Sequence, residues 1–237
     1  TDDAEKTFDK IFTVSISAGG GGDDSPTTLT SMSLLNTSAA DQPAGSITPI
    51  FGHLFQRGDI PSGTAPLFHL EDGTNVHYSM SKQTRAHRDG SLFHAAFMLR
   101  LPVGIPASSS LTINVLNGGA APSASARALD DFSAGTLDLN VTVTGLDNLS
   151  GDWVSSLNQG IAANGADYQY MDGDAGAVWR VPAAFRQSSA DHGQLEGWWY
   201  VAALQDAEGN LAGVRHLTRV TQPYYNVASP SPDFRSF

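Results

Sequence analysis

The stretch Leu92-Phe-His-Ala-Ala-Phe-Met-Leu-Arg100 predicts a β-strand that is covered on both of its faces. Successive side chains of a strand point to opposite faces, and here both alternating sets are nearly apolar. One set is Phe93, Ala95, Phe97 and Leu99, and the other is Leu92, His94, Ala96 and Met98. Such a strand belongs at the centre of a β-structure, with a core on one side and a second cover on the other.

Short alternating segments of the same kind continue in both directions from this strand. Gly, Pro, Asn-Gly and Asp-Gly steps separate them, and these residues favour tight turns. Asp72-Gly73 and Glu208-Gly209-Asn210 each predict a hairpin connection between two segments. The pattern predicts an all-β fold with strands at 65–70, 75–82, 92–100, 110–116, 136–144, 178–185, 197–204 and 213–221.

The two ends of the chain differ from this central part. Phe8, Ile11 and Phe12 have the spacing of one helix face, while residues 12–17 alternate as a strand does. Gly19–Gly22 then interrupts regular structure and is typical of a flexible linker. We therefore expect an extended N-terminal arm with a glycine linker over residues 1–27, a β domain over 28–228 and a C-terminal tail over 229–237.

Composition narrows the range of partners. The 237 residues include 13 Lys and Arg against 24 Asp and Glu, which gives a formal net charge of −11. Affinity for nucleic acid comes mainly from cationic side chains, so we expect no nucleic-acid partner. We also expect no membrane insertion, because no apolar run has the length of a spanning helix. The absence of cysteine excludes thiol catalysis and zinc–thiolate sites.

The densest set of reactive side chains is His87-Arg-Asp-Gly-Ser-Leu-Phe-His94. His87 and His94 would lie on opposite arms of a hairpin and suggest a binding or metal site, and Ser91 with Asp89 suggests a nucleophile. Asp89-Gly90-Ser91 is equally the composition that a hairpin turn requires. We favour a structural turn without a catalytic or metal site, because no further ligand, base or orienting group is evident.

Asp172-Gly173-Asp174 resembles the beginning of a calcium loop, since hard cations prefer clustered carboxylates beside a glycine. The acidic residue that should complete such a loop is missing. We therefore interpret this segment as a solvated turn, and we expect no cofactor.

Aromatic residues gather at Trp198-Trp199-Tyr200. In a strand, Trp198 and Tyr200 share one face and Trp199 points to the other, so at least one of these faces belongs to the core. The remaining aromatic rings can stack on a sugar ring. These three residues, together with His87 and His94, are the candidate binding residues, and a glycan is the candidate ligand.

Several segments together resemble the RIFT-like β-barrel domain at the N-terminus of exo-rhamnogalacturonan lyase-type proteins. The resemblance is most specific from Phe51 to Leu116, where the His87-x-Asp-Gly-Ser-x-x-His94-Ala core lies. It continues more loosely through Gly176–Arg180 and Trp198–Val201. The resemblance implies a single closed β-barrel without catalytic residues of its own, and similar barrels occur in virion proteins of tailed bacteriophages.

We therefore expect a non-enzymatic structural or attachment module of a larger assembly, specifically a tailed-bacteriophage virion protein of the tail or fibre. Its partners would be other subunits of an oligomer, and its place the virion or the extracellular space. The alternative is a carbohydrate-associated accessory module of a secreted polysaccharide lyase. A free-standing enzyme would need a convergent set of titratable groups, and His87, Asp89 and His94 are the only candidates for such a set.

Overall fold

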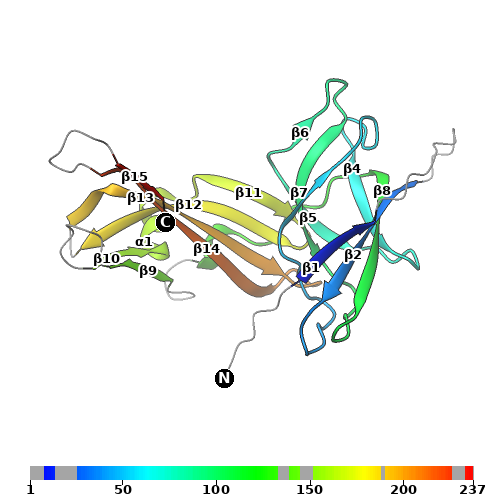
Figure 1. Cartoon of the computed structure of the whole chain (residues 1–237), viewed down its shortest axis with the longest axis horizontal. Helices are drawn as coiled ribbons and strands as arrows, with labels where there is room; N and C mark the ends of the chain where they lie inside the picture. Colours follow the sequence, from blue (N-terminus) through cyan, green and yellow to red (C-terminus); the bar gives the residue numbers. More distant parts are fainter. Residues whose placement is uncertain are drawn as a thin grey trace. The chain divides into compact units, whose positions relative to one another are not determined.

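The computed structural model describes residues 8–13, 26–132, 139–144, 152–187, 190–225 and 233–236. Among these residues, nearly all regular structure is β-strand, with a short 3₁₀ turn at Leu129–Phe132 and the helix α1 at Leu157–Asn164. The all-β prediction is confirmed (Figure 1). The chain forms two compact units, and each is described separately below.

Unit 1 consists of residues 1–126, 171–176 and 205–210. One antiparallel sheet has the order β1-β2-β8-β4, and the second has the order β11-β5-β7-β3, with the short β6 beside β7 (Figure 1). The strands are β1 (Phe8–Thr13), β2 (Thr28–Asn36), β3 (Phe51–Leu54), β4 (Ala65–Leu70), β5 (His77–Ser81), β6 (Arg85–Ala86), β7 (Leu92–Arg100), β8 (Ser110–Gly119) and the end of β11 (Tyr168–Gly173).

The core of unit 1 is built on the strand that was predicted to be covered on both faces. Phe97 of β7 is fully buried, and the rings of Phe51, Phe55, Phe68 and Tyr78 pack around it at centroid distances of 5.1 to 6.1 Å. Three of these rings meet Phe97 at interplanar angles of 61° to 84°, the edge-on arrangement that aromatic quadrupoles prefer, and the Phe51 ring is tilted by 42°. The other face of β7 is also covered, since Met98 is 1% exposed.

Unit 2 consists of residues 127–170, 177–204 and 211–237. Its strands have the order β15-β14-β13-β12, with β10 paired to β12 and β9 paired to β10. The bounds are β9 (Asn140–Val143), β10 (Trp153–Ser156), β12 (Gly176–Gln187), β13 (Ala190–Gln205), β14 (Leu211–Tyr225) and β15 (Asp233–Ser236). A separate core forms from one face of β12 and β13 with Phe132 and Leu157.

The expectation of a single closed barrel was wrong. In the part of the chain that the structure describes, the strands form open antiparallel sheets without a closed barrel. Residues 28–228 also contribute to two cores in place of one. Alternation of apolar and polar residues predicts that a strand is half-buried, but it does not determine whether the outermost strands pair and close the sheet.

The ends of the chain also differ from their predictions. Phe8–Thr13 is a strand that pairs with β2, so the helical spacing of Phe8, Ile11 and Phe12 did not predict its structure. Sheet pairing overrides such a short local pattern. In the expected tail, Asp233–Ser236 forms β15 and pairs with β14. The glycine run Gly19–Gly22 and the boundary expected at residue 228 lie outside the described residues.

Candidate functional site

The segment from His87 to Ser91 forms a tight turn between β6 and β7. Gly90 has a φ of +87° and donates its backbone N–H to the His87 carbonyl at 3.0 Å. The Asp89 carboxylate accepts hydrogen bonds from the Ser91 backbone N–H at 3.1 Å and from the Ser91 hydroxyl at 2.6 Å. Asp and Gly therefore have the roles that turn chemistry assigns to them.

This turn is bonded to the loop that follows β3. Arg57 Nε donates to Asp89 at 2.9 Å, and the Ser91 hydroxyl oxygen accepts the Gly58 N–H at 3.0 Å. The hydrogen bonds from Ser91, followed by that from Arg57, hold the pKa of Asp89 far below its ordinary value. Since the Ser91 hydroxyl donates to Asp89, the turn lacks the serine-to-histidine bond on which a nucleophilic serine depends.

The two histidines of this segment have different surroundings. The His87 ring lies 3.0 Å from the Phe55 carbonyl through Nε2 and packs against the Phe93 ring at a centroid distance of 4.9 Å. His94 instead lies over Gly52, where an added Cβ would come within 2.9 Å of its Nε2. Within the described residues, no group of three or more His, Asp or Glu is arranged to hold a metal ion.

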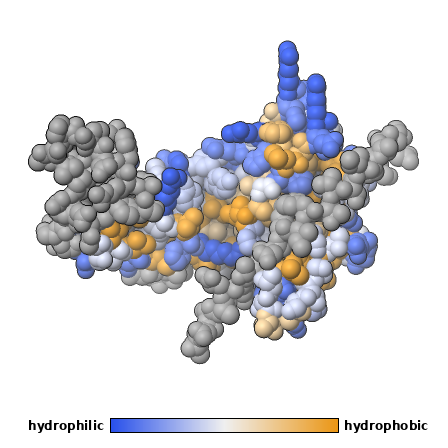
Figure 2. Space-filling view, in the orientation of Figure 1, coloured by the Kyte–Doolittle hydropathy of each residue, from blue (hydrophilic) through white to orange (hydrophobic). Residues whose placement is uncertain are grey.

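The surface beside His94 combines apolar and charged residues. His94 is the cross-strand partner of Leu54 on one side and of Arg85 on the other. Leu54 is 63% exposed. Figure 2 shows hydrophilic side chains projecting at the β6 end of unit 1, with apolar side chains beside them.

The three consecutive aromatic residues of β13 are divided between two faces. Trp199 is fully buried in the unit 2 core, and its indole N–H donates to the buried Ser155 hydroxyl at 3.2 Å. Trp199 is therefore a core residue, and its inclusion among the binding residues was wrong. Strand alternation places it on the same face as the buried Val201 and Ala203, whereas Trp198 and Tyr200 are half-buried on the opposite face.

Trp198 and Tyr200 belong to a set of side chains that we name the Arg180 patch. Arg180 of β12 forms an ion pair with Asp167 through both Nε and Nη2, and the Nε bond measures 3.0 Å. The carbon of the Arg180 guanidinium lies 4.2 Å from the centroid of the Trp198 ring. The hydrogen bond to Asp167 raises the pKa of Arg180, and contact with the Tyr200 hydroxyl adds to this effect.

Two tyrosines of β11, Tyr168 and Tyr170, complete the patch. Burial raises the pKa of the Tyr170 hydroxyl, and the nearby hydroxyls of Tyr168 and Tyr200 raise it further. Tyr168, Tyr170, Trp198 and Tyr200 are all half-buried, and none belongs to the hydrophobic core of unit 2. The patch therefore combines four aromatic side chains with one internally neutralised ion pair, all within unit 2.

Sequence reasoning found Trp198 and Tyr200 but missed the rest of the patch. Asp167 and Arg180 come together because the Asp167 N–H donates to the Arg180 carbonyl at 2.9 Å, next to β11. The spacing Tyr168-Gln-Tyr170 was the available signal, because residues two apart share one face of a strand.

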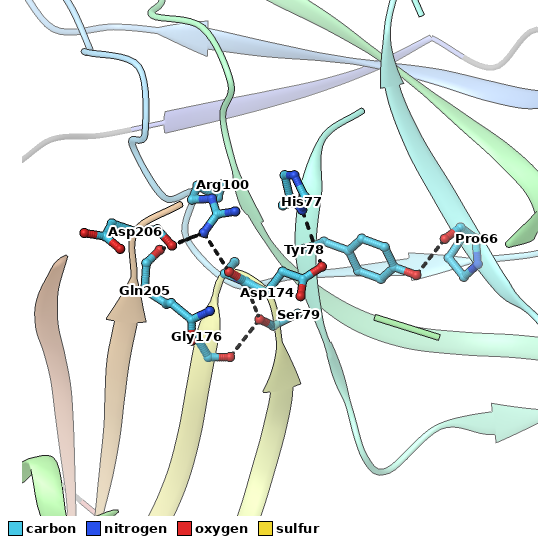
Figure 3. Close-up of polar contacts among 10 residues, drawn as sticks. Pro66, His77, Tyr78, Ser79, Arg100, Asp174, Gly176, Gln205 and Asp206 are labelled. Atoms are coloured by element: carbon cyan, nitrogen blue, oxygen red, sulfur yellow. Dashed lines mark hydrogen bonds and ion pairs between the residues drawn. The ribbon is translucent and has the colours of Figure 1, made fainter. Parts of the chain in front are cut away.

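A second polar cluster is centred on Arg100, which is 7% exposed (Figure 3). Its Nη1 donates to the backbone carbonyls of Asp174 at 3.0 Å, of Gln205 at 3.4 Å and of Asp206. The Ser79 hydroxyl accepts the Ala175 N–H at 3.1 Å and donates to the Gly176 carbonyl at 2.7 Å. This cluster holds the β11–β12 and β13–β14 turns within unit 1.

The carboxylates of the calcium-like segment are also bonded to the protein. Asp172 accepts the Ser125 N–H at 2.9 Å and lies 3.7 Å from the Lys82 ammonium, while Asp174 lies 3.4 Å from His77 Nδ1. The two carboxylates contact different partners. We therefore assign the Arg100 cluster to architecture and consider the Arg180 patch the better binding site.

Comparison with known proteins finds no match among protein families, curated proteins or solved structures. Within the described residues, no helix has the length and apolar character needed to cross a membrane.

Proposed function

We propose that this protein is a non-enzymatic attachment module of a larger assembly, and that it recognises a neutral carbohydrate through the Arg180 patch. The observation that carries the proposal is the gathering of half-buried aromatic side chains around Arg180 on one face of β11, β12 and β13. Aromatic rings offer flat apolar surfaces to the C–H face of a sugar, and their polar ends can bond its hydroxyls.

The charges of the patch favour a neutral ligand. The Arg180 guanidinium is already paired with Asp167, so it offers little net positive charge to a uronic or sialic acid. The whole chain has a formal net charge of −11, which further disfavours anionic glycans. The Arg180 side chain thus acts as a rigid wall of the patch, because it is fixed by Asp167 and by Trp198.

The kind of assembly is proposed from the sequence resemblance of residues 51–116 to the N-terminal domain of exo-rhamnogalacturonan lyase-type proteins, since similar domains occur in tailed-bacteriophage virion proteins. Recognition of a glycan on a cell surface is a common task for an attachment protein. The same patch would also serve an accessory module of a secreted polysaccharide lyase. Imaging of the native particle separates the two: many contacting copies support the virion protein, and one copy joined to a large catalytic part supports the lyase module.

Affinity electrophoresis tests the ligand class. The full chain would be run through gels that contain galactomannan or xyloglucan as neutral probes, or polygalacturonate as an anionic probe, and the same oligosaccharides would be titrated by calorimetry. We expect retardation by a neutral polysaccharide and none by polygalacturonate. Trp198→Ala should weaken the binding constant about fivefold or more, since a stacking contact contributes on the order of 1 kcal/mol.

Leu217→Ala is the matched control, because Leu217 lies in the same unit on β14 and is 66% exposed. This variant should bind as the unchanged chain does. The proposal fails if neither neutral polysaccharide retards the chain, or if Trp198→Ala leaves the retardation unaltered.

A further inference from the structure

The outermost strand of the four-stranded sheet of unit 1 is β1. It pairs antiparallel with β2 over six residue pairs, from Phe8 opposite Asn36 to Thr13 opposite Ser31. In the sheet order, β2 lies between β1 and β8 (Figure 1). In the described sheet, β1 is thus an edge strand whose backbone pairs with β2.

The connection between β1 and β2 is unusually long for two consecutive antiparallel strands. Hairpin strands are normally joined by about two to five residues. Here residues 14–27 join them, and Gly19–Gly22 lies within this connection. A chain of this length can span roughly 40 Å at about 3.3 Å per residue, far more than the spacing between two paired strands of about 4.8 Å.

The position of β2 is established without help from β1. Thr28 to Leu35 of β2 pair with Leu116 to Ser110 of β8. Met32 and Leu34 are at most 2% exposed and belong to the unit 1 core. The edge of β2 that receives β1 is thus held in an extended, preformed conformation by the rest of unit 1.

We propose that β1 is exchanged between copies of this chain, so that β1 of one copy pairs with β2 of another. The exchanged pairing makes the same backbone hydrogen bonds as the pairing within one chain, which is the basis of strand swapping. The balance between pairing within one chain and pairing between two chains then depends on the connection of residues 14–27 and on the local protein concentration. A high local concentration of copies in an assembly favours exchange.

Single-cysteine variants test the exchange, because the chain has no cysteine of its own. Ile11 and Ser33 are cross-strand partners, and such pairs have the separation that a disulfide requires. A tagged Ile11→Cys chain and an untagged Ser33→Cys chain would be refolded together and oxidised. We expect a disulfide-linked heterodimer on a non-reducing gel, in a yield that rises with protein concentration.

The matched control replaces Ser33→Cys with Leu217→Cys, an exposed position that is not a partner of β1 in the described register. This mixture should give at least about tenfold less heterodimer. The proposal is overturned if the Ile11 and Ser33 mixture gives no more heterodimer than the control. The double variant Ile11→Cys/Ser33→Cys shows that the register itself is correct, since it must form a disulfide within or between chains.

Discussion

The Asp89 turn of unit 1 and the Arg180 patch of unit 2 each contain an arginine–aspartate pair, but their surroundings differ. In the turn, Asp89 is bonded to Ser91 and Arg57, and the Ser91 hydroxyl also accepts the Gly58 N–H. In the patch, Arg180 is bordered by Trp198 and Tyr200, which remain half-buried. The comparison shows that the polar groups of the turn are taken up by bonds within it and to the loop after β3, whereas the Arg180–Asp167 pair is bordered by aromatic side chains that stay half-buried.

The sharpest test of this contrast within the patch uses the adjacent residues Trp198 and Trp199. Trp199→Ala should lower the free energy of unfolding by about 3 to 5 kcal/mol, because it empties a buried site and leaves Ser155 without its donor. Trp198→Ala should cost less than half of that and should affect ligand binding instead. Urea unfolding followed by fluorescence measures both, and equal losses would show that Trp198 also belongs to a core.

Substitutions in the unit 1 core should have the next largest effect on the free energy of unfolding. Phe97→Ala should cost about 3 to 5 kcal/mol, since Phe97 is fully buried among four other aromatic rings. Phe93→Ala is the matched variant on the same strand, where the side chain is 36% exposed and should cost clearly less. Thermal and urea unfolding of the two variants would contradict our placement of β7 if the order were reversed.

Ser91→Ala measures how firmly the turn is tied to its neighbouring loop. The variant removes the donor to Asp89 and the acceptor of the Gly58 N–H at a side chain that is 3% exposed. We expect a loss of about 1 to 3 kcal/mol in the free energy of unfolding. The exposed Ser62→Ala is the control and should change stability by less than about 0.5 kcal/mol. An unchanged stability of Ser91→Ala would mean that water replaces both bonds.

The smallest expected effect is the contribution of Asp89 to stability at acidic pH. Hydrogen bonds to the carboxylate hold the pKa of Asp89 in the folded protein below the unfolded value of about 3.9. The stability that Asp89 contributes is therefore present above about pH 4 and is lost as the pH falls further. Asp89→Asn should reduce the fall in the urea midpoint between about pH 5 and pH 3 relative to the unchanged chain. Parallel curves for the two proteins would contradict this assignment.

The fold was predictable where a single strand carries a clear alternation. The predicted ranges 65–70 and 92–100 match β4 and β7 at both ends. The strands β2, β3, β10 and β11 were among those missed. Phe51-Gly-His-Leu54 contains a glycine and Tyr168-Gln-Tyr170 is only weakly apolar, whereas β2 alternates and was still not predicted. Sheet closure and the number of cores depend on pairing between distant strands, which a local pattern does not encode.

A local sequence pattern could likewise predict only part of the Arg180 patch. Alternation alone separated Trp199 from Trp198 and Tyr200, because it needs only one strand. Arg180 is 13 residues from Asp167 and contacts Trp198 from another strand, so these neighbours become evident only in the folded sheet. Ser91 gives an example of each kind of contact. Its bond to Asp89 lies within one turn and follows from the local sequence, whereas its bond to Gly58 joins residues 33 positions apart and is evident only in the fold.

The Arg100 cluster also has a consequence for the order of events during synthesis. Arg100 and Asp206 are 106 residues apart, and residues 171–176 and 205–210 belong to the same unit as residues 1–126. At translation rates of about 5 to 20 residues per second, residue 206 is synthesised roughly 5 to 20 seconds after Arg100. During that interval its cationic side chain is solvated and the hydrogen bonds to both later turns are unmade. A nascent chain released at residue 126 would therefore carry the first unit in an incomplete form, exposed to chaperones and proteases until the final hairpin turn arrives.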